Sequence, residues 1–297
     1  MRTPFFTTSR GALFADDCLA VLRTMRSAVI DTVFADPPFN LGKDYKNGYH
    51  DRVAQAEYMT WCRQWIMECS RVLKPGGSFF IYATPELAVQ FAPILGEQLA
   101  FRHWIALTMK GTYPRGRKLY PAHYALLYYT RGTPRVFNRL RLPIETCRHC
   151  GKEIKDYGGH RNKMNADGVN LTDFWTDTSP NRHRKFKVRP GVNELKLVIP
   201  ERAILLSTDP DDLIFDPFGG GGSTYQAAEK HERFWMGTEL YDSSHIRRRI
   251  QENYTFSAAR DPQFDLQGLF CDEDNSHEVL RGFKGKSVSA GTVAHFP

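Results

Sequence analysis

A glycine-rich segment at residues 216–224 has the composition of a loop that binds a nucleoside. Its sequence, Asp-Pro-Phe-Gly-Gly-Gly-Gly-Ser-Thr, follows an apolar run at 213–215 and precedes an amphipathic run that ends at Lys230. Glycine allows a backbone to approach a ligand closely, and the first turn of a helix offers N–H groups to it. Glu239 stands 23 residues after Asp216, at the end of the next apolar run. A carboxylate at that place typically binds ribose hydroxyls, so the expected chemistry is nucleoside binding.

The residues around the glycines narrow the class of ligand. No lysine directly precedes Ser223, so the loop does not match a P-loop that holds the phosphates of a nucleoside triphosphate. A nicotinamide enzyme stays open, but Asp216 would then lie close to a pyrophosphate. A negative residue there suits a cationic or phosphate-free nucleoside better. The alternative without a function is a flexible turn followed by an unrelated acid. The order of strand, loop, helix, strand and acid argues against it.

A second segment with chemical potential is Asp36-Pro-Pro-Phe-Asn40, which follows an apolar run at 31–35. Two consecutive prolines end a strand and hold the turn after it rigidly. The segment therefore presents a carboxylate and an aromatic ring just beyond the end of a strand. Ligands of open α/β sheets bind at such ends, although a turn without chemical function would have the same prolines.

The elements that must position the two segments alternate between strands and helices. The apolar runs predict strands at 12–14, 31–35, 78–83, 104–109, 124–130, 213–215 and 234–240. The amphipathic runs predict helices after Asp17 (with Met25 on its apolar face) and at 55–73, 86–99, 194–206, 223–230 and 243–254. Alternation of this kind predicts an α/β fold with a doubly wound, mostly parallel sheet.

The two segments together resemble motifs of the amino-methylating DNA methyltransferases, the N6-adenine/N4-cytosine family. Asp36 to Phe39 is similar to the family's catalytic motif, and 216–222 is similar to its S-adenosylmethionine (AdoMet) loop. The catalytic motif comes first, a basic segment follows and the cofactor loop comes last, which resembles the β-class order. The resemblance extends over residues 11–254. It implies a Rossmann-like AdoMet-dependent methyltransferase sheet with a circularly permuted motif order and an inserted target-recognition region.

The resemblance, together with the weak periodicity of residues 131–190, divides the chain into four parts. Residues 1–130 are expected to form the catalytic half of the methyltransferase domain and residues 131–190 the target-recognition insertion. Residues 191–255 are expected to form the AdoMet-binding half, and 256–297 a polar C-terminal tail.

The resemblance also assigns roles in catalysis. An exocyclic amine of a nucleobase is a poor nucleophile, because its lone pair is delocalised into the ring. The carboxylate of Asp36 and the carbonyl of Pro37 would accept the two amine hydrogens and free the lone pair to attack the sulfonium methyl group. Phe39 would stack on the base, which must be flipped out of the duplex to reach the site. The expected catalytic residues are Asp36, Pro37, Pro38 and Phe39.

The family's cofactor contacts carry over one position at a time. The acid that contacts the adenine edge of AdoMet would be Asp17, with Asp16 as the adjacent alternative. Many members carry Lys-Pro where this chain has Asn193-Glu194, so one of these two residues would replace that contact to the methionine part. The expected cofactor-binding residues are Asp17, Asp216, Pro217, Phe218, Gly219, Gly220, Gly221, Ser223, Thr224, Glu239 and Asn193.

The positive charge of the chain is concentrated in one segment. The whole chain carries a net charge of +7, but residues 102–190 hold 19 Lys and Arg against 6 Asp and Glu, which is +13, and the rest carries −6. Such a segment is either a solvated basic face or a surface that follows nucleic-acid phosphates. Aromatic residues within it, such as Phe174 and Trp175, suit base stacking or a core. The candidates for DNA contact are Lys110, Arg115, Arg117, Lys118, Arg161, Lys163, Arg182, Arg184 and Lys185.

The cysteines indicate neither a disulfide scaffold nor a complete metal site. Six cysteines in a chain of 297 residues are typical of a protein in the reducing cytoplasm. Cys147 and Cys150 have the spacing of half a zinc site, but no second Cys-x-x-Cys follows, so no metal is expected and the pair is a weak candidate. The other predicted thiols, which fall in helices and should be buried, are Cys18, Cys62 and Cys69.

The sequence as a whole predicts a site-specific DNA methyltransferase that uses AdoMet and modifies N6 of adenine in a short recognition sequence. Adenine is preferred because family members that act on N4 of cytosine mostly begin the catalytic motif with Ser, whereas this chain has Asp36. The alternatives are an N4-cytosine enzyme of the same fold and a DNA-binding protein that has lost catalysis.

The expected partners follow from the same resemblance. Double-stranded DNA is the expected substrate, although the basic segment does not distinguish DNA from RNA. A homodimer and a cognate restriction endonuclease are further partners that the family suggests. The chain has no apolar run of about 18 residues that would span a membrane and no signal-peptide pattern between Met1 and Arg10, so we expect a cytoplasmic protein.

Overall fold

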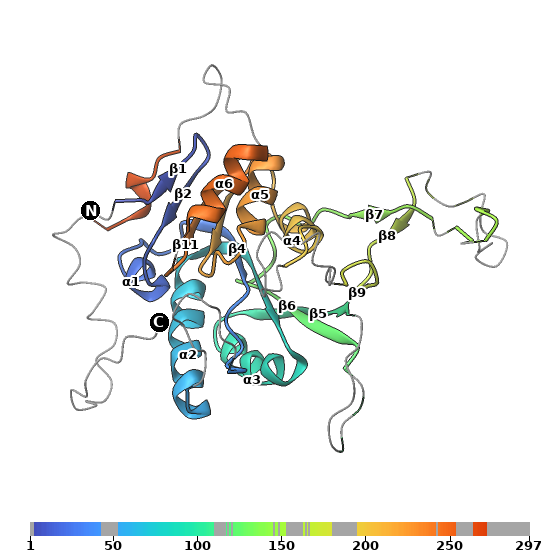
Figure 1. Ribbon diagram of the computed structural model, residues 1–297, viewed down its shortest axis with the longest axis horizontal. Coiled ribbons are helices and arrows are strands. Elements are labelled where there is room, and N and C mark those ends of the chain that lie inside the picture. The colour runs from blue at the N-terminus through green and yellow to red at the C-terminus, as the bar shows by residue number, and fades with distance from the viewer. Residues whose placement is uncertain are drawn as a thin grey trace.

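The centre of the protein is a mixed sheet with helices on both faces (Figure 1). The structure, a computed structural model, describes residues 3–42, 53–109, 117, 119, 121–144, 146–147, 149–152, 163, 165, 167–179, 195–241, 243–253 and 264–271. Its strands are β1 (Phe6–Thr7), β2 (Gly11–Phe14), β3 (Ile30–Ala35), β4 (Leu73–Ala83), β5 (Ala100–Thr108), β6 (His123–Thr130), β7 (Arg141–Leu142), β8 (Val169–Asn170), β9 (Phe174–Trp175), β10 (Leu213–Asp216) and β11 (Phe234–Thr238). Its helices are α1 (Cys18–Leu22), α2 (Gln55–Val72), α3 (Pro85–Gly96), α4 (Val198–Ser207), α5 (Ser223–Lys230), α6 (Ser244–Asn253) and the short 3₁₀-helix η3 (Gln267–Leu269).

The main sheet has nine described strands in the order β1-β2-β11-β10-β3-β4-β6-β5-β9. The five strands from β2 to β4 run parallel to one another. Strand β6 is antiparallel to both of its neighbours, β4 and β5, and β1 is antiparallel to β2 at the other edge. The predicted α/β fold with a mostly parallel sheet is therefore confirmed.

Strands β10 and β3 are neighbours in the sheet although they lie far apart in the chain. Ile214 pairs with Thr32, and Phe215 pairs with Val33. From β10 the chain passes through α5 to β11 on one side, and from β3 it passes through α2 to β4 on the other. Connections that diverge in this way leave a crevice at the carboxyl ends of the two central strands. The permuted order thus brings the two predicted chemical segments to one place.

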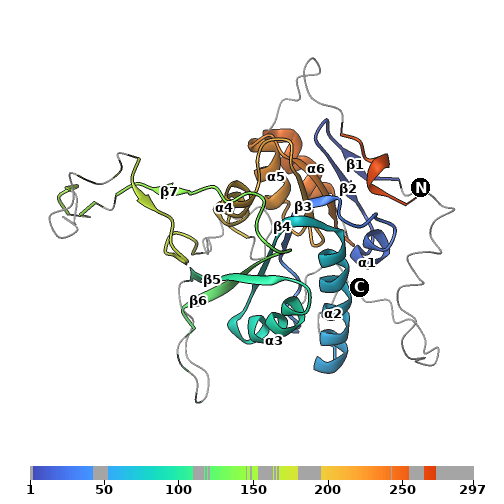
Figure 2. The same ribbon diagram turned by 180° about the vertical axis from the view of Figure 1, so that it is seen from behind.

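Three hydrophobic clusters, one on one face of the sheet and two on the other, hold the helices against it. Helices α2 and α3 contribute Trp65 and Phe91 to one core, and α5 and α6 contribute Tyr225 and Ile250 to another. Figures 1 and 2 show α5 and α6 side by side, away from α2 and α3. All six residues of β3 are buried, as expected of a central parallel strand that is covered on both faces. No described helix has the length and apolarity needed to cross a membrane.

Tertiary contacts move some element boundaries away from the sequence predictions. Strand β4 begins at Leu73, directly after α2, and not at residue 78. Its register with β3 shifts so that residues 74–77 bulge over Asp31. Gly77 is required there, because an added Cβ would lie 2.9 Å from the Asp31 carbonyl oxygen. A register that depends on a strand distant in the chain leaves no local signal.

Four further boundaries differ in a similar way. Strand β5 begins four residues earlier than predicted, at Ala100, and α3 ends three residues earlier, at Gly96. Helix α4 begins only at Val198, which places Pro200 in the first turn, where its missing N–H costs no intrahelical hydrogen bond. Met25 lies beyond the end of α1 and forms an isolated bridge with Phe270.

An arm leaves the body after β6 and returns to it at β9. Strands β7 and β8 pair with each other outside the main sheet, and they project from the body in Figures 1 and 2. Strand β9 then pairs with β5 of the main sheet. Trp175 is 1% exposed, and the Arg202 guanidinium lies 5.2 Å above its ring while it makes two 2.7 Å hydrogen bonds to Asp177. Of the two open roles for Trp175, the structure supports the core; Phe174 is exposed.

Candidate active site

The turn that is predicted to be catalytic, residues 36–40 (hereafter the catalytic turn), begins where β3 ends, and contacts from elsewhere in the chain hold it. The Tyr58 hydroxyl, on α2, donates to the Pro38 carbonyl oxygen at 2.6 Å. Asn40 follows with a φ of +55°, a left-handed conformation that asparagine tolerates better than most residues. Its side chain accepts from Val53 N at 2.9 Å and donates to Val53 O at 3.0 Å. The turn that carries Asp36 is therefore fixed at both ends.

Three aromatic rings gather beside Asp36. The Phe39 ring centroid lies 5.9 Å from that of Tyr82 and 6.2 Å from that of Tyr124, and the two tyrosine rings are 4.9 Å apart. Tyr82 is the last residue but one of β4 and Tyr124 is the second residue of β6, so three neighbouring elements supply the cluster. Phe39 and Tyr124 are both half-buried, whereas Tyr82 is buried. The cluster thus leaves aromatic surface open to stack on a planar ligand.

The glycine loop between β10 and α5 is folded tightly against the end of β11. Gly219 N donates to Thr238 O at 2.8 Å, and the Thr238 hydroxyl donates to Pro217 O at 2.6 Å. Gly220 and Gly222 have φ values of +50° and +75°, which residues with a side chain rarely adopt. The loop therefore needs glycine for two separate reasons, close packing and backbone conformation.

Asp216 lies beneath this loop and helps to build it. It is 2% exposed, and its Oδ1 accepts from Phe218 N at 2.9 Å. Burial raises the pKa of its carboxyl, and the nearby charges of Asp36 and Glu239 raise that pKa further. Three acids thus share one electrostatic environment at the carboxyl ends of β3, β10 and β11. The ring of Phe218 lies 5.1 Å from that of Trp65, so much of it packs into the core.

Glu239 follows β11 and touches the glycine loop, as its spacing predicts. Its Oε2 accepts from Gly220 N at 2.6 Å, and its own N–H donates to Phe14 O at 3.0 Å. His245, at the start of α6, places its Nε2 2.6 Å from Gly220 O. This second contact to the loop comes from the helix expected at 243–254, for which no role in the site was predicted, so His245 was missed.

The predicted adenine contact lies at the end of β2. Asp17 caps α1, because its Oδ1 accepts from Ala20 N at 2.9 Å, and Asp16 Oδ1 accepts from Asp17 N at 2.8 Å. Both acids are half-exposed, and they follow β2, which pairs with β11, the strand that precedes Glu239. The choice between them as a cofactor contact stays a prediction.

Several predicted residues lie outside the described part of the chain. Of the DNA-contact candidates, Arg117 and Lys163 are described, and both are exposed. The predicted residues without a description are Asn193, Lys110, Arg115, Lys118, Arg161, Arg182, Arg184 and Lys185. Their roles stay predictions.

The cysteines divide into a buried and an accessible group. Burial raises the pKa of the Cys62 thiol to about 12, and Cys18 and Cys69 are buried in the same core, as predicted. Cys147 lies in a tight turn, and backbone hydrogen bonds at Cys150 and then His149 lower the pKa of its thiol. Within the ranges that the structure describes, no group of three His, Cys, Asp or Glu side chains is placed to hold a metal.

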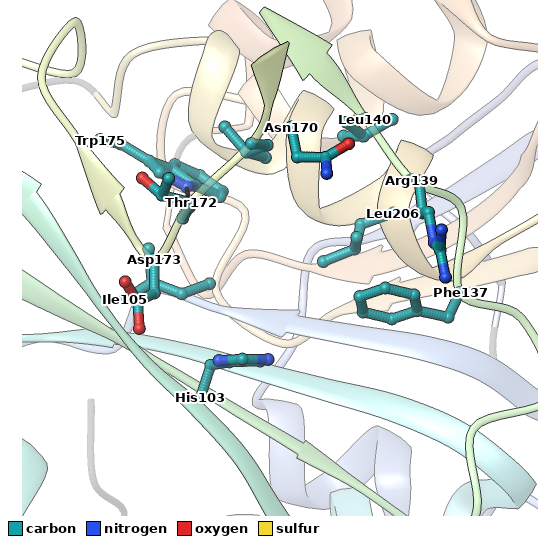
Figure 3. Close-up of a pocket in the computed structure, with 11 residues that line it drawn as sticks. His103, Ile105, Phe137, Arg139, Leu140, Asn170, Thr172, Asp173, Trp175 and Leu206 are labelled. Carbon is teal, nitrogen blue, oxygen red and sulfur yellow. Dashed lines mark hydrogen bonds between the residues drawn. The ribbon is translucent and has the colours of Figure 1, made fainter. Parts of the chain in front are cut away.

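A separate cavity of about 210 Å³ lies between β5, β9 and α4 (Figure 3). Its lining includes His103, Arg139 and Asp173 beside apolar residues such as Phe137 and Leu206. None of the described catalytic or cofactor residues predicted from the sequence lines it. The chemistry at the strand ends therefore does not depend on this cavity.

Sequence reasoning missed the tyrosines of the site. Tyr58 sits on a helix whose apolar face was predicted only as core, whereas its hydroxyl holds the catalytic turn. Tyr82 and Tyr124 were contained in predicted strands without a role. A signal was present, because Tyr82 lies near the carboxyl end of β4, the next strand after the Asp36 turn, and the carboxyl ends of adjacent parallel strands meet at one edge.

Comparison with known proteins places this site in a family. The DNA methylase family N6_N4_Mtase matches residues 30–246. The Type II methyltransferase M.BamHI of Bacillus amyloliquefaciens is 46% identical over 273 residues, which are 92% of this chain and 63% of that protein. The chain thus spans less than two thirds of the length of that relative.

Solved structures with the same fold have low sequence identity. The PvuII DNA methyltransferase (cytosine-N4-specific) has a TM-score of 0.60 at 18% identity, with 86% of this chain and 91% of that chain covered. The M1.HpyAVI–SAM complex has a TM-score of 0.55 at 16% identity, with 82% and 100% covered. These two similarities show the fold alone. The family match spans most of the chain and includes both strand ends that build the site, so the chain belongs to the N6_N4_Mtase family of DNA methylases.

Proposed function

We propose that this protein is a site-specific DNA methyltransferase that transfers the methyl group of AdoMet to N6 of an adenine. The observation that carries the proposal is the meeting of the Asp36 turn and the glycine loop at the ends of neighbouring strands, β3 and β10. One segment would bind the nucleobase and the other the cofactor. Reactants held side by side in this way gain most of their rate from orientation and electrostatics.

The residues at the end of β10 fit a cationic nucleoside. Asp216 is buried, and among the described residues its partners are Phe218 N and Thr224, with no cation in contact. Asp36 and Glu239 add negative charge to the same place. A sulfonium ion would offset that charge, whereas a pyrophosphate would add to it. When bound, AdoMet supplies an electrophilic methyl group. The residues proposed to hold it are Asp17, Asp216, Pro217, Phe218, Gly219, Gly220, Gly221, Ser223, Thr224, Glu239 and Asn193.

The catalytic turn supplies the groups that an exocyclic amine needs. The Asp36 carboxylate and the Pro37 carbonyl oxygen accept the two amine hydrogens, and the carboxylate takes the proton that the amine loses. The Tyr58 hydroxyl donates a 2.6 Å hydrogen bond to the next carbonyl oxygen, that of Pro38, so the turn keeps its conformation when the base binds. Phe39 stacks on the flipped base.

Adenine is the proposed target because the motif begins with Asp36, and Ser mostly stands there in N4-cytosine members of the family. N4 of cytosine is the second candidate, since the PvuII enzyme with this fold is cytosine-N4-specific. We also propose double-stranded DNA as the substrate. A cognate restriction endonuclease is a proposed partner because M.BamHI is a Type II methyltransferase.

The test uses the purified chain, labelled AdoMet and DNA that contains many sequences. Mass spectrometry of the digested DNA should find N6-methyladenine, and N4-methylcytosine would select the second candidate. Asp36→Ala should lower the rate of methyl transfer about 10²- to 10⁴-fold while DNA binding is retained. Asp209→Ala is the matched control, because this exposed acid lies before β10, at the amino end of the strand and away from the site at its carboxyl end. Retained activity in Asp36→Ala would overturn the mechanism.

A further inference from the structure

One buried tyrosine differs from the others in its hydroxyl group. The structure describes five buried tyrosines, and four of them, Tyr58, Tyr128, Tyr129 and Tyr225, have a hydrogen-bond partner for the hydroxyl. Tyr82 is 7% exposed, and its hydroxyl makes no hydrogen bond within the described residues. Its oxygen is not one of the fully buried side-chain atoms without a partner, so the hydroxyl is accessible although the ring is buried. A donor in that position can bind a ligand without giving up a hydrogen bond within the protein.

The position of Tyr82 identifies the site that this hydroxyl serves. Ala35 of β3 pairs with Ile81 of β4, so the next residues along the two strands, Asp36 and Tyr82, are neighbours at the carboxyl edge. The Tyr82 ring contacts Phe39 at 5.9 Å with an interplanar angle of 32°. Burial is the main cause that raises the pKa of Tyr82, and the charge of Asp36 adds to it. The hydroxyl thus stays protonated and is available as a donor.

We propose that the Tyr82 hydroxyl donates a hydrogen bond to the ring nitrogen next to the amine of the flipped base. This inference rests on the proposed function, in which Asp36 holds that amine and Phe39 stacks on the ring. The atom beside the amine is an acceptor in both candidate targets, N1 of adenine and N3 of cytosine.

The first test removes the hydroxyl alone. Tyr82→Phe should lower kcat/KM for methyl transfer about 5- to 100-fold, because the acceptor on the base is left unpaired. Its Tm should equal or exceed that of the parent protein, since no hydrogen bond within the protein is lost. Tyr128→Phe is the matched control: Tyr128 lies on the same face of the sheet, but its hydroxyl is 3.4 Å from Ser78 Oγ. This control should keep the parent rate.

The second test removes the acceptor from the DNA. The substrate is a duplex with the recognition site found by methylation-aware sequencing and with 1-deazaadenine at the target position, so that C–H replaces N1. If the product proves to be N4-methylcytosine, 3-deazacytosine takes its place. The changed ring alters the amine for every enzyme variant, so the comparison between variants carries the result. On the deaza substrate, kcat/KM of the parent enzyme should fall by an additional factor equal to the one that Tyr82→Phe causes on normal DNA. The Tyr82→Phe enzyme should show no such additional fall in kcat/KM.

The outcomes separate this inference from the function on which it rests. If the parent protein transfers no methyl group to DNA, the proposed function fails and the inference fails with it. If the parent is active and Tyr82→Phe matches it, the inference alone is overturned. Independent, multiplicative losses for the two changes would overturn it as well, and so would a Tm of Tyr82→Phe several degrees below that of the parent.

Discussion

Gly219 should tolerate no side chain, and the atoms around it give the size of the effect. An added Cβ would lie 2.8 Å from the Tyr225 hydroxyl and 3.1 Å from both Thr238 O and Ile246 Cδ1. The loop cannot retreat freely, because Gly219 N donates to Thr238 O at 2.8 Å and the Tyr225 hydroxyl is held by Asp216 O at 3.2 Å. We expect Gly219→Ala to lower the free energy of unfolding by about 1–3 kcal/mol. At roughly 2–4 °C per kcal/mol for a chain of this size, Tm should fall by several degrees.

Other glycines provide controls that separate a steric clash from backbone strain. Gly96→Ala has no neighbour within 4 Å of the new Cβ, and at a helix end it should be neutral or slightly stabilising. Gly132→Ala (φ +78°) and Gly220→Ala (φ +50°) would meet no atom closer than 3.6 Å but need a left-handed conformation, which costs about 1–2 kcal/mol. Gly222→Ala combines a φ of +75° with an approach of 2.9 Å to an Ile246 methyl group and should be the worst of the set.

Thermal denaturation measures the loss of stability in these variants, and calorimetric titration with AdoMet measures the loss of cofactor affinity. Alanine at Gly132, Gly219, Gly220 or Gly222 should lower Tm, but only the three changes in the loop should also weaken AdoMet binding. The Kd for AdoMet should rise roughly tenfold for each 1.4 kcal/mol of binding free energy that is lost. A Gly219→Ala protein with the parent Tm and affinity would refute the reasoning. So would a loss of AdoMet affinity in Gly132→Ala equal to that in Gly219→Ala, because Gly132 lies outside the loop.

Three further predictions concern charge and thiols. Arg202 lowers the pKa of Asp177. The ion pair therefore stabilises the fold above the unfolded pKa of about 3.9, and this stabilisation is lost as pH falls through the pKa of the folded state. Because the Asp177 side chain is 53% exposed, Asp177→Asn should lower Tm by only about 2–4 °C at pH 7 and not at pH 2. Native Cys147 should react with a thiol reagent at pH 7 well before Cys62, as peptide mass mapping can show, since backbone hydrogen bonds lower the pKa of the first thiol and burial raises that of the second to about 12. Arg117→Gln should reduce the slope of log K against log salt for DNA binding by about 1, and an unchanged slope would remove Arg117 from the phosphate contacts.

Periodicity and spacing predicted the parts of the fold that local sequence decides. The glycine loop at 216–224, the acid at Glu239 and the strand before Asp36 are local patterns, and each lies where it was expected. The adjacency of β3 and β10 is not local, because the two strands lie far apart in the chain. Only the resemblance to a permuted family supplied it.

The features that sequence reasoning missed all depend on contacts between distant segments. The hydrogen bond from Tyr58 to Pro38 joins a helix to a turn 20 residues earlier. The bulge over Asp31 follows from a register set by a neighbouring strand. Phe218 is predicted to line the cofactor pocket, and its ring also packs against Trp65, a contact that the sequence did not indicate. In each case a side chain has two plausible surroundings, and tertiary packing selects between them.

Two buried acids at opposite ends of the neighbouring strands β3 and β10 show how the site differs from the rest of the core. Asp31 is 4% exposed and is fully compensated: Lys74 Nζ lies at 2.7 Å, an Arg135 nitrogen at 3.3 Å, and Leu213 N donates at 3.0 Å. Asp216 is 2% exposed at the carboxyl end of the strand that begins at Leu213, and among the described residues no cation contacts it. Its carboxyl instead accepts hydrogen bonds from Phe218 N and from the Thr224 side chain. A buried carboxyl without a neighbouring cation is costly to ionise, so a positive charge that arrives with a ligand would be favourable at this end of the sheet. A sulfonium cofactor carries such a charge.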